Sequence, residues 1–188
     1  MSPDNITKSV LLPYKQIIPP FHCMTPMVAI TGAGGFVGRW TVERLVGQGM
    51  RVRTLQSPAE DLSSPSSLRN FVAGAKVFVH LAGKNRASES EIRFSNVDCT
   101  LGLLQAIDMY GEKDALFLLA SSLQVYKPTS LISLLREDAE TDSSDTFSKS
   151  KLLAESAVRE WSESGKIRGI SMRIRSYALD RQSVGLDR

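Results

Sequence analysis

Three glycines at a regular spacing are the residues of this chain whose pattern points most directly to chemistry. They stand at Gly32, Gly35 and Gly38, after the apolar run 28–31 and at the start of an amphipathic helical pattern. Glycine allows a sharp turn and a close approach of the backbone to a pyrophosphate, because no Cβ is in the way. The first N–H groups of the following helix are available to phosphate. The stretch predicts a dinucleotide site, although its spacing is one residue wider than the general Gly-x-Gly-x-x-Gly fingerprint.

The elements around this turn alternate between buried strands and helices. The apolar patterns and turn signals predict strands at 28–31, 51–56, 76–83, 115–120 and 167–174, and helices at 36–47, 64–73, 88–110, 131–135 and 147–164. Parallel strands joined by helices form a doubly wound sheet, so we expect a Rossmann-like α/β fold. Within the third of these strands, His80 is interpreted as a hydrogen-bonded core residue. The small residues after it, Ala82 and Gly83, are expected at the ligand crevice.

The composition is that of one globular domain. The chain has 188 residues, of which 42% are hydrophobic and 23% charged, and its net charge of +3 is spread along the sequence. With no basic run, nothing points to a nucleic-acid partner. Cys23 and Cys99 have no metal-ligand spacing, which suits a reducing compartment and predicts no metal site. No apolar stretch is long enough for a membrane span, so we expect a cytoplasmic protein.

The two ends of the chain differ in composition from its middle. Residues 1–24 hold four of the eight prolines and show no sustained periodicity, so we expect a poorly ordered arm over 1–26. An alternative is that this arm is upstream sequence and that the natural product starts at Met24. The dinucleotide-binding domain is expected over 27–177, and 178–188 are expected to form a tail.

The choice between NAD and NADP stays open at the sequence level. The end of the second strand carries an acidic residue in NAD proteins, or lies near a basic group in NADP proteins, and here it is Gln56. Glutamine can hydrogen-bond a ribose hydroxyl and repels a phosphate less than a carboxylate does. Arg39 and Arg53 are candidate partners of a phosphate, and an equally good interpretation makes both of them solvated surface charges.

Five motifs occur in an order that resembles one known family. They are Thr31-Gly32-x-x-Gly35-x-x-Gly38, Asp61-Leu62, His80-Leu81-Ala82-Gly83, Asn96-Val97 and Ser121-Ser122-x-x-Val125-Tyr126. Over about 27–177 the chain resembles the extended short-chain dehydrogenase/reductases, in particular the NAD-dependent epimerase/dehydratase group. The resemblance implies NAD or NADP as cofactor, a nucleotide-sugar-like substrate, and a role in nucleotide-sugar metabolism. The residues that it implies for cofactor binding are Gly32, Gly35, Phe36, Val37, Gly38, Gln56, Asp61, Leu62, Leu81, Ala82, Gly83 and Lys151.

The resemblance also implies a catalytic set in which one member is changed. The family motif Tyr-x-x-x-Lys corresponds here to Phe147-Ser148-Lys149-Ser150-Lys151, and Ser122 matches the family serine that shares the substrate proton. In the family, the tyrosine transfers this proton and the lysine lowers the pKa of the phenol and holds the ribose. Phenylalanine keeps the ring but has no ionisable group. We therefore expect a catalytically impaired protein.

Two further parts of the family pattern are missing. Only four residues separate Gln56 from Asp61, too few for the family's third strand, so that strand is expected to be vestigial or missing. Few residues follow 177, so a C-terminal substrate domain is expected to be absent. Three hypotheses follow: a silent nucleotide-binding protein, an oxidoreductase or epimerase of weak activity that uses Ser122 and Lys151, or a truncated gene product without function.

An additional expectation concerns assembly. In the family, two long helices of each subunit commonly form a dimer interface, and the helices expected at 88–110 and 147–164 carry more apolar positions than one covered face needs. These positions include Phe94, Leu101, Leu104, Met109 and Trp161. We expect a homodimer, and the alternative is that these side chains are buried against the sheet.

Overall fold

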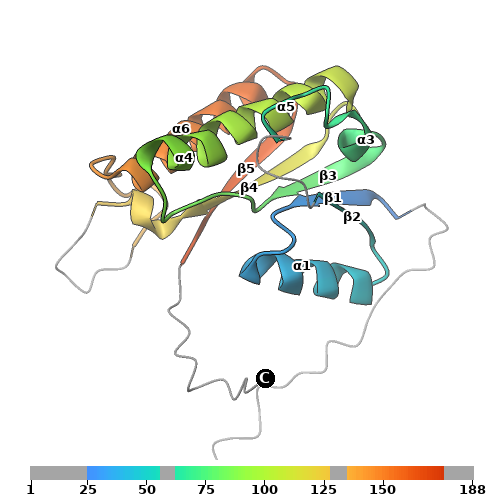
Figure 1. Cartoon of the computed structure of the whole chain (residues 1–188), viewed down its shortest axis with the longest axis horizontal. Coiled ribbons are helices and arrows are strands. Elements are labelled where there is room, and N and C mark those ends of the chain that lie inside the picture. The colour runs from blue at the N-terminus through green and yellow to red at the C-terminus, as the bar shows by residue number, and fades with distance from the viewer. Residues whose placement is uncertain (1–24, 56–61, 128–134, 176–188) are drawn as a thin grey trace, which may run out of the picture.

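The computed structural model describes residues 25–55, 62–127 and 135–175, and shows a parallel sheet with helices on both faces (Figure 1). The elements are β1 (Met27–Thr31), α1 (Phe36–Gly47), β2 (Arg51–Leu55), α3 (Arg69–Val72), β3 (Ala75–His80), α4 (Glu89–Arg93), the π-helical turn η1 (Phe94–Asp98), α5 (Cys99–Tyr110), β4 (Leu116–Ser122), the 3₁₀ turn η2 (Leu123–Val125), α6 (Thr146–Glu163) and β5 (Arg168–Ile174).

The sheet confirms the predicted fold class. Its five strands run parallel in the order β2-β1-β3-β4-β5, so the chain reverses its direction of travel across the sheet between β2 and β3. A reversal of this kind creates a crevice at the carboxyl ends of the central strands. Among the described residues no strand pairs with the outer edge of β2, which agrees with the missing third strand; residues 56–61 lie outside the description.

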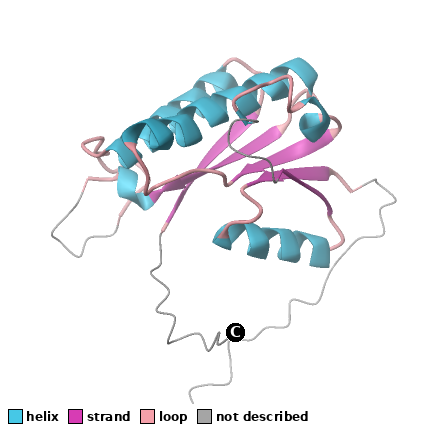
Figure 2. Ribbon diagram, in the orientation of Figure 1, coloured by secondary structure: helices cyan, strands magenta, loops and turns pink. Residues whose placement is uncertain are grey.

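The helices divide unequally between the two faces of the sheet. The helices α3 to α6 cover one face, and α1 is the one described helix on the other (Figures 1 and 2). The larger core lies under α3 to α6 and centres on Phe78, Leu103 and Phe117. The smaller core lies under α1, where Val42 and Leu45 pack against Val28 and Ile30. The first face is therefore a complete layer, and the second is covered only over β1, β2 and part of β3.

The helix predicted over 88–110 is interrupted. Its start is correct, because Ser88 and Glu91 form the predicted capping box. The segment Phe94–Asp98 then winds as a π-helix, which inserts a residue between α4 and α5. This turn buries Ser95, Asn96 and Val97. Apolar spacing does not distinguish a π-helical turn from an α-helix, so no sequence pattern predicted this turn.

Several predicted boundaries need correction. The strand β3 ends at His80, so 81–83 form a connecting loop, and the predicted helix 64–73 is a series of turns with α3 only at Arg69–Val72. Residue 56 and most of the predicted helix 131–135 lie outside the described residues. The remaining predicted elements are present with ends within two residues of expectation.

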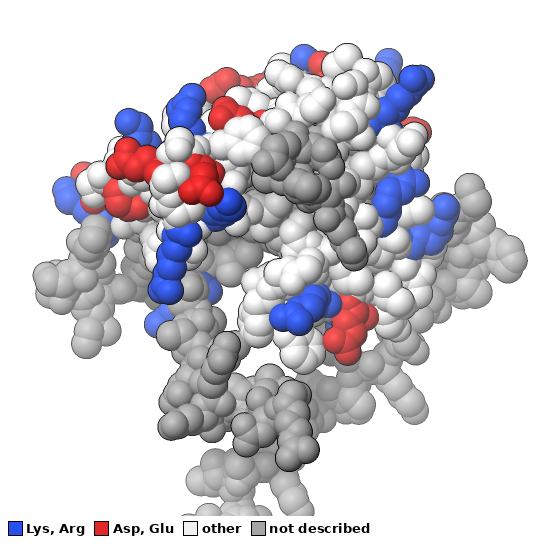
Figure 3. Space-filling model, in the orientation of Figure 1, with Lys and Arg blue, Asp and Glu red and all other residues white. Residues whose placement is uncertain are grey.

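The surface carries both signs of charge, interspersed over the face seen in Figure 3. Within the described part of the chain, no helix has the length and apolar character that crossing a membrane would need. In the same described residues, no three His, Cys, Asp or Glu side chains are grouped so that they could hold a metal ion.

The positions expected at a dimer interface divide between core and surface. Leu104 is completely buried in the larger core and is not available to a partner, while Phe94, Leu101 and Trp161 pack partly against that core. Met109 is 60% exposed. The homodimer remains a prediction, and Leu104 is no longer among the residues expected at its interface.

Candidate functional site

Two adjoining cavities open at the carboxyl ends of the strands. The larger, of about 860 Å³, is lined by the glycine turn, the ends of β4 and β5, and the first turns of α6. The smaller, of about 360 Å³, lies between the glycine turn, β2 and η1. Both are lined by Gly32, Gly35, Leu81, Gly83 and Lys84, so they form one continuous cleft in two parts. A ligand with two halves joined at the glycine turn matches this shape.

At two positions of the turn, Gly32 and Gly38, the neighbouring backbone lies too close for any residue with a Cβ. Gly32 has φ +70°, and a Cβ there would lie 2.6 Å from the amide nitrogen of Ala82. A Cβ on Gly38 would lie 2.1 Å from the carbonyl oxygen of Gly32. Gly34, in contrast, has open space around it. The spacing therefore presses α1 onto the turn and the turn onto the loop after β3, which leaves the helix N-terminus facing the larger cavity.

The first turn of α1 can attract an anion, because its N–H groups are uncapped by a side chain and the turn holds no acidic residue. Its N-cap is Gly35, which has no side chain to bond the first N–H groups, and the turn contains no acidic residue. Phe36, Val37 and Gly38, which form this turn, line the larger cavity.

A buried histidine fixes the loop that lies against the glycine turn. His80 is 1% exposed, and its Nδ1 lies 2.6 Å from Thr31 Oγ1 while its Nε2 lies 3.1 Å from Thr100 Oγ1. Thr31 Oγ1 accepts from the amide of Ala82, and Thr100 Oγ1 donates to the carbonyl of Asn96. These directions assign a neutral ring with its proton on Nε2.

The pKa of His80 agrees with that assignment. Burial and the positive charge of Lys151 lower it from 6.5 to about 3. The interpretation of His80 as a hydrogen-bonded core residue is confirmed, and its bonds connect β1, β3 and α5.

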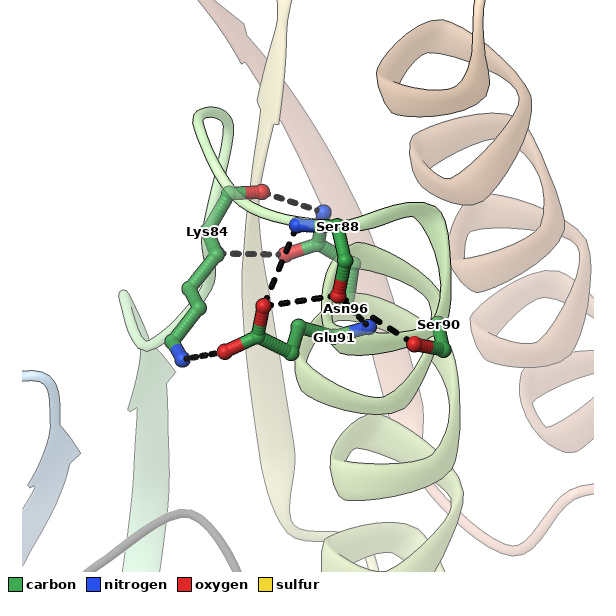
Figure 4. A network of polar contacts seen from close by, with 5 residues as sticks. All are labelled: Lys84, Ser88, Ser90, Glu91 and Asn96. Carbon is green, nitrogen blue, oxygen red and sulfur yellow. Dashed lines mark hydrogen bonds and ion pairs between the residues drawn. The ribbon is translucent and has the colours of Figure 1, made fainter.

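Asn96, presented by the π-helical turn, fixes the backbone of Lys84, a residue that lines both cavities. Its Oδ1 accepts from the amide of Lys84 at 3.0 Å, and its Nδ2 donates to the carbonyl of Lys84 and to Ser150 Oγ (Figure 4). Glu91 holds the same loop from outside, because it accepts from Ser88 and forms an ion pair with Lys84 at 3.2 Å (Figure 4). The hydrogen bonds from Ser88, with a smaller effect of Lys84, lower the pKa of Glu91 to about 2.

The first turns of α6 are fixed in position from two sides. Asp145 caps the helix by accepting from the amide of Ser148 at 2.9 Å, and Ser148 Oγ donates to the carbonyl of Gln124 in η2. Ser150 Oγ donates to the carbonyl of Phe147 and accepts from Asn96. These contacts hold the helix surface that carries residues 147 and 151 against the cleft.

Phe147 and Lys151 meet one helical turn apart at the larger cavity. Lys151 Nζ lies 5.9 Å from the centroid of the Phe147 ring and donates to the carbonyl of Ala120 at 2.9 Å. Burial lowers the pKa of this ammonium from 10.5 to about 8, and the opposing effect of Glu155 is smaller. Ser122 lines the same cavity from the end of β4, and its Oγ accepts from the amide of Gln124.

Glu155 connects α6 to the two last strands below the cavity. Its carboxylate accepts from Ser121 Oγ and forms an ion pair with Arg173 at 2.7 Å. Arg173 also lies 4.5 Å from the centroid of the Tyr126 ring. The hydrogen bonds that Arg173 donates to the Glu155 carboxylate raise the pKa of Arg173 further above its ordinary value. The arrangement fixes α6 in register with β4 and β5.

The cleft brings together most of the site residues expected from the sequence. The larger cavity is lined by Gly32, Gly35, Phe36, Val37, Gly38, Leu81, Gly83, Ser122, Phe147 and Lys151, and the smaller one adds Leu62 and Ala82. The backbone at Leu62 can approach α5 because Gly102 has no side chain, and a Cβ there would lie 2.2 Å from the carbonyl oxygen of Leu62. Gln56 and Asp61 lie outside the described residues.

Sequence reasoning missed other residues that line the cleft. Asn85, Gln124, Ile174 and Arg175 line the larger cavity, and Leu55 and Ser95 the smaller. Ile174 is the last residue of β5, and Gln124 lies two residues after the end of β4. Their place at the carboxyl ends of strands was the signal that could have identified them. Ser95 depends on the π-helical turn, which no sequence pattern indicated.

Arg53 has a contact that neither interpretation included, because its Nη1 donates to the carbonyls of Asn70, Phe71 and Ala73. Arg53 therefore binds the end of α3. Arg39 is exposed on α1.

Fold and cleft together define a dinucleotide-binding α/β domain of the Rossmann type. The family model of the NAD-dependent epimerase/dehydratase family matches residues 28–180. The chain belongs to this family, as the motifs predicted.

Similar proteins agree with this assignment and are longer. A ceramide reductase of Caulobacter vibrioides is 35% identical in an alignment of length 118 that covers 55% of this chain and 37% of that protein. A short-chain dehydrogenase/reductase superfamily protein of Agrobacterium tumefaciens with bound NAD is 27% identical, with a TM-score of 0.69 over 78% of this chain and 48% of that one. The protein RMD of Pseudomonas aeruginosa, complexed with NADPH, is 27% identical, with a TM-score of 0.70 over 81% and 54%. The chain spans about half the length of these solved structures.

Proposed function

We propose that this protein binds NAD or NADP in the cleft and does not turn over substrate at an appreciable rate, because Phe147 replaces the tyrosine that transfers the proton. The observation that carries the proposal is the placement of Phe147 beside Lys151 and opposite the glycine turn, in one cavity. The dinucleotide-binding unit is proposed to extend over residues 27–177.

The residues of the cleft fit a dinucleotide. The close packing at Gly32 and Gly38 brings the backbone to the cavity wall with no side chain between, and the first turn of α1 offers N–H groups without a repelling carboxylate. The smaller cavity presents apolar Leu62 and Leu81 to a base, with Asp61 proposed beside them. Lys151 would hold the ribose, and a bound cofactor would supply hydride transfer.

The chain keeps the orienting groups and lacks the proton-transfer group. Lys151 is positioned by Ala120, and Ser122 lies at the end of β4. A phenylalanine at 147 neither donates nor accepts a proton. General acid–base catalysis by one side chain typically contributes ~10²–10⁴-fold to a rate, so its loss suffices to silence the site.

Calorimetric titration with NAD, NADH, NADP and NADPH tests the binding. We expect one oxidised and reduced pair to bind with a dissociation constant below about 1 mM, which corresponds to about 4 kcal/mol. The pair that binds identifies the cofactor. A protein that is folded by circular dichroism and binds none of the four at millimolar concentration would contradict the proposal and favour a product of gene decay.

Two glycine variants test whether binding uses the turn. Gly38→Ala places a methyl group 2.1 Å from the Gly32 carbonyl oxygen, so the turn and α1 must separate, and cofactor affinity is expected to fall by tenfold or more, about 1.4 kcal/mol. Gly34→Ala adds the same methyl group in open space at a residue without positive φ. This control is expected to bind as the unchanged protein does, and equal affinities in the two variants would place the cofactor elsewhere.

A further inference from the structure

The ammonium group of Lys151 is buried without a counter-charge at contact distance. Among the residues that the structure describes, none makes an ion pair with its Nζ, and Glu155, one turn further along α6, pairs with Arg173. Nζ donates to the Ala120 carbonyl at 2.9 Å and lies 5.9 Å from the centroid of the Phe147 ring. An ammonium has three donors, so one hydrogen bond compensates poorly for the burial of this charge.

The nitrogen of Lys151 can be reached from the larger cavity. Lys151 lines that cavity, and so does Gly83 in the loop after β3. A Cβ on Gly83 would lie 3.2 Å from Nζ, so the missing side chain leaves the nitrogen uncovered on this side. The cavity, at about 860 Å³, has room for a small organic molecule beside the nitrogen.

Titratable groups from several elements lie around this end of the cavity. They are His80 at the end of β3, Lys84 in the following loop with its partner Glu91 on α4, Glu155 on α6, and Arg175 after β5. Burial keeps His80 neutral, and the described residues that line the cavity include the cations Lys84 and Arg175 but no carboxylate. Glu155 favours the charged form of Lys151, with a smaller effect than burial has in the opposite direction. The surroundings as a whole therefore favour the neutral amine.

This environment increases the amount of neutral amine that is present near pH 7. Burial lowers the pKa of Lys151 from 10.5 to about 8. At pH 7.5 about a quarter of the molecules then carry the neutral amine, against about one in a thousand for a lysine of pKa 10.5. The neutral amine has the lone pair that a nucleophile needs.

We propose that Lys151 is a nucleophilic amine that forms an imine with a small aldehyde in the larger cavity, preferentially an aldehyde that also carries a carboxylate. The lone pair of Nζ attacks the carbonyl carbon, and the new C–N bond gives a carbinolamine. Both hydrogens of the amine then leave with the carbonyl oxygen as water, so the C=N bond forms without an oxidant or a reductant. Lys84 and Arg175 supply the positive charge that attracts the carboxylate. The imine belongs to the protein without cofactor, because the ribose of a bound cofactor is proposed to occupy Lys151.

Reductive trapping with glyoxylate and cyanoborohydride tests the proposal on the full chain. The reductant converts an imine into a stable secondary amine, and mass spectrometry of the peptides measures the modification of each lysine. At pH 7.5 Lys151 is expected to react at least about tenfold faster than acetyl-lysine amide in the same mixture, because its neutral fraction is about two hundred times larger while the cavity slows access. Equal or slower reaction would overturn the proposal. The mixture contains no nucleotide, so the result is independent of the proposed cofactor binding.

Two lysine variants assign the reaction to its residue. Lys151→Met is expected to lose the fast modification. Lys149→Met, at an exposed residue of the same helix, is expected to retain it. Circular dichroism shows whether both variants are folded. Fast modification that persists in folded Lys151→Met would place the nucleophile elsewhere and contradict the proposal.

The pH profile and a second aldehyde test the chemistry itself. The rate at Lys151 relative to acetyl-lysine amide is expected to fall more than tenfold between pH 8 and pH 10, because the reference amine loses its proton over this range and Lys151 has already lost most of its own. A ratio that stays constant would show an ordinary lysine. Propanal, which has no carboxylate, is expected to give a smaller ratio than glyoxylate at pH 7.5, and equal ratios would overturn the preference for an anionic aldehyde.

Discussion

Phe147→Tyr is expected to produce measurable NAD(P)-dependent oxidation or reduction of a small alcohol or carbonyl compound, in a protein that otherwise shows none. The change adds one hydroxyl to a ring already positioned beside Lys151 and Ser122, so the fold should tolerate it. The neighbouring ammonium favours the phenolate and lowers the pKa of the new phenol. The expected gain is ~10²–10⁴-fold over background, the range of a general acid–base residue. The absorbance of the reduced nicotinamide measures it.

Two further results make the test specific. Adding Ser122→Ala or Lys151→Met to Phe147→Tyr is expected to remove the gained activity, because each deletes a group of the same cavity. Cofactor affinity of Phe147→Tyr itself should stay within a few-fold of the unchanged protein. A loss of tenfold or more, about 1.4 kcal/mol, would show that Phe147 has a role other than filling the tyrosine's place.

Lys151→Met is expected to stabilise the fold at pH 7 while weakening cofactor binding by at least about tenfold. Burial lowers the pKa of Lys151 from 10.5 to about 8, so the folded protein carries a charge that costs about 3 kcal/mol at neutral pH. Methionine removes that cost and also removes the hydrogen bond to the Ala120 carbonyl, worth about 1 kcal/mol. The net gain in unfolding free energy is about 2 kcal/mol.

The gain has a defined pH dependence. A group whose pKa is lower in the folded state destabilises the fold below that pKa, and the penalty disappears as pH rises past the unfolded value. The penalty of Lys151 is therefore complete below about pH 8 and absent above 10.5. The variant should be more stable at pH 7 and, having lost the hydrogen bond, less stable by about 1 kcal/mol above pH 10.5.

Urea unfolding of Lys151→Met and of the unchanged protein across this pH range measures the difference in their free energies of unfolding. The titrations of other groups affect both proteins equally and cancel in this difference. Lys149→Met is the control, because Lys149 is exposed on the same helix two residues away and should change stability by less than about 0.5 kcal/mol at every pH. A difference between Lys151→Met and the unchanged protein that does not vary with pH would contradict the assigned burial of the charge.

Much of this architecture could be predicted because it depends on local signals. The central strands β1, β3 and β4 are largely apolar, since a parallel sheet buries both faces of its central strands. Ser88 and Asp145 start their helices by bonding N–H groups within the first turn. The glycine turn could be predicted for a related reason. A Cβ at residue 32 or 38 would clash with neighbouring backbone, and the sequence shows this directly because both residues are glycine.

The tertiary structure decided what depends on partners distant in sequence. Arg53 looks like a surface charge, and only packing against α3 brings the carbonyls of residues 70–73 within its reach. Asn96 reaches Lys84 and Ser150 because a π-helical turn directs it there, and helical periodicity does not reveal that turn. The depressed pKa of Lys151 is likewise a property of burial. Burial is determined by all the layers together, and no single stretch of sequence contains them.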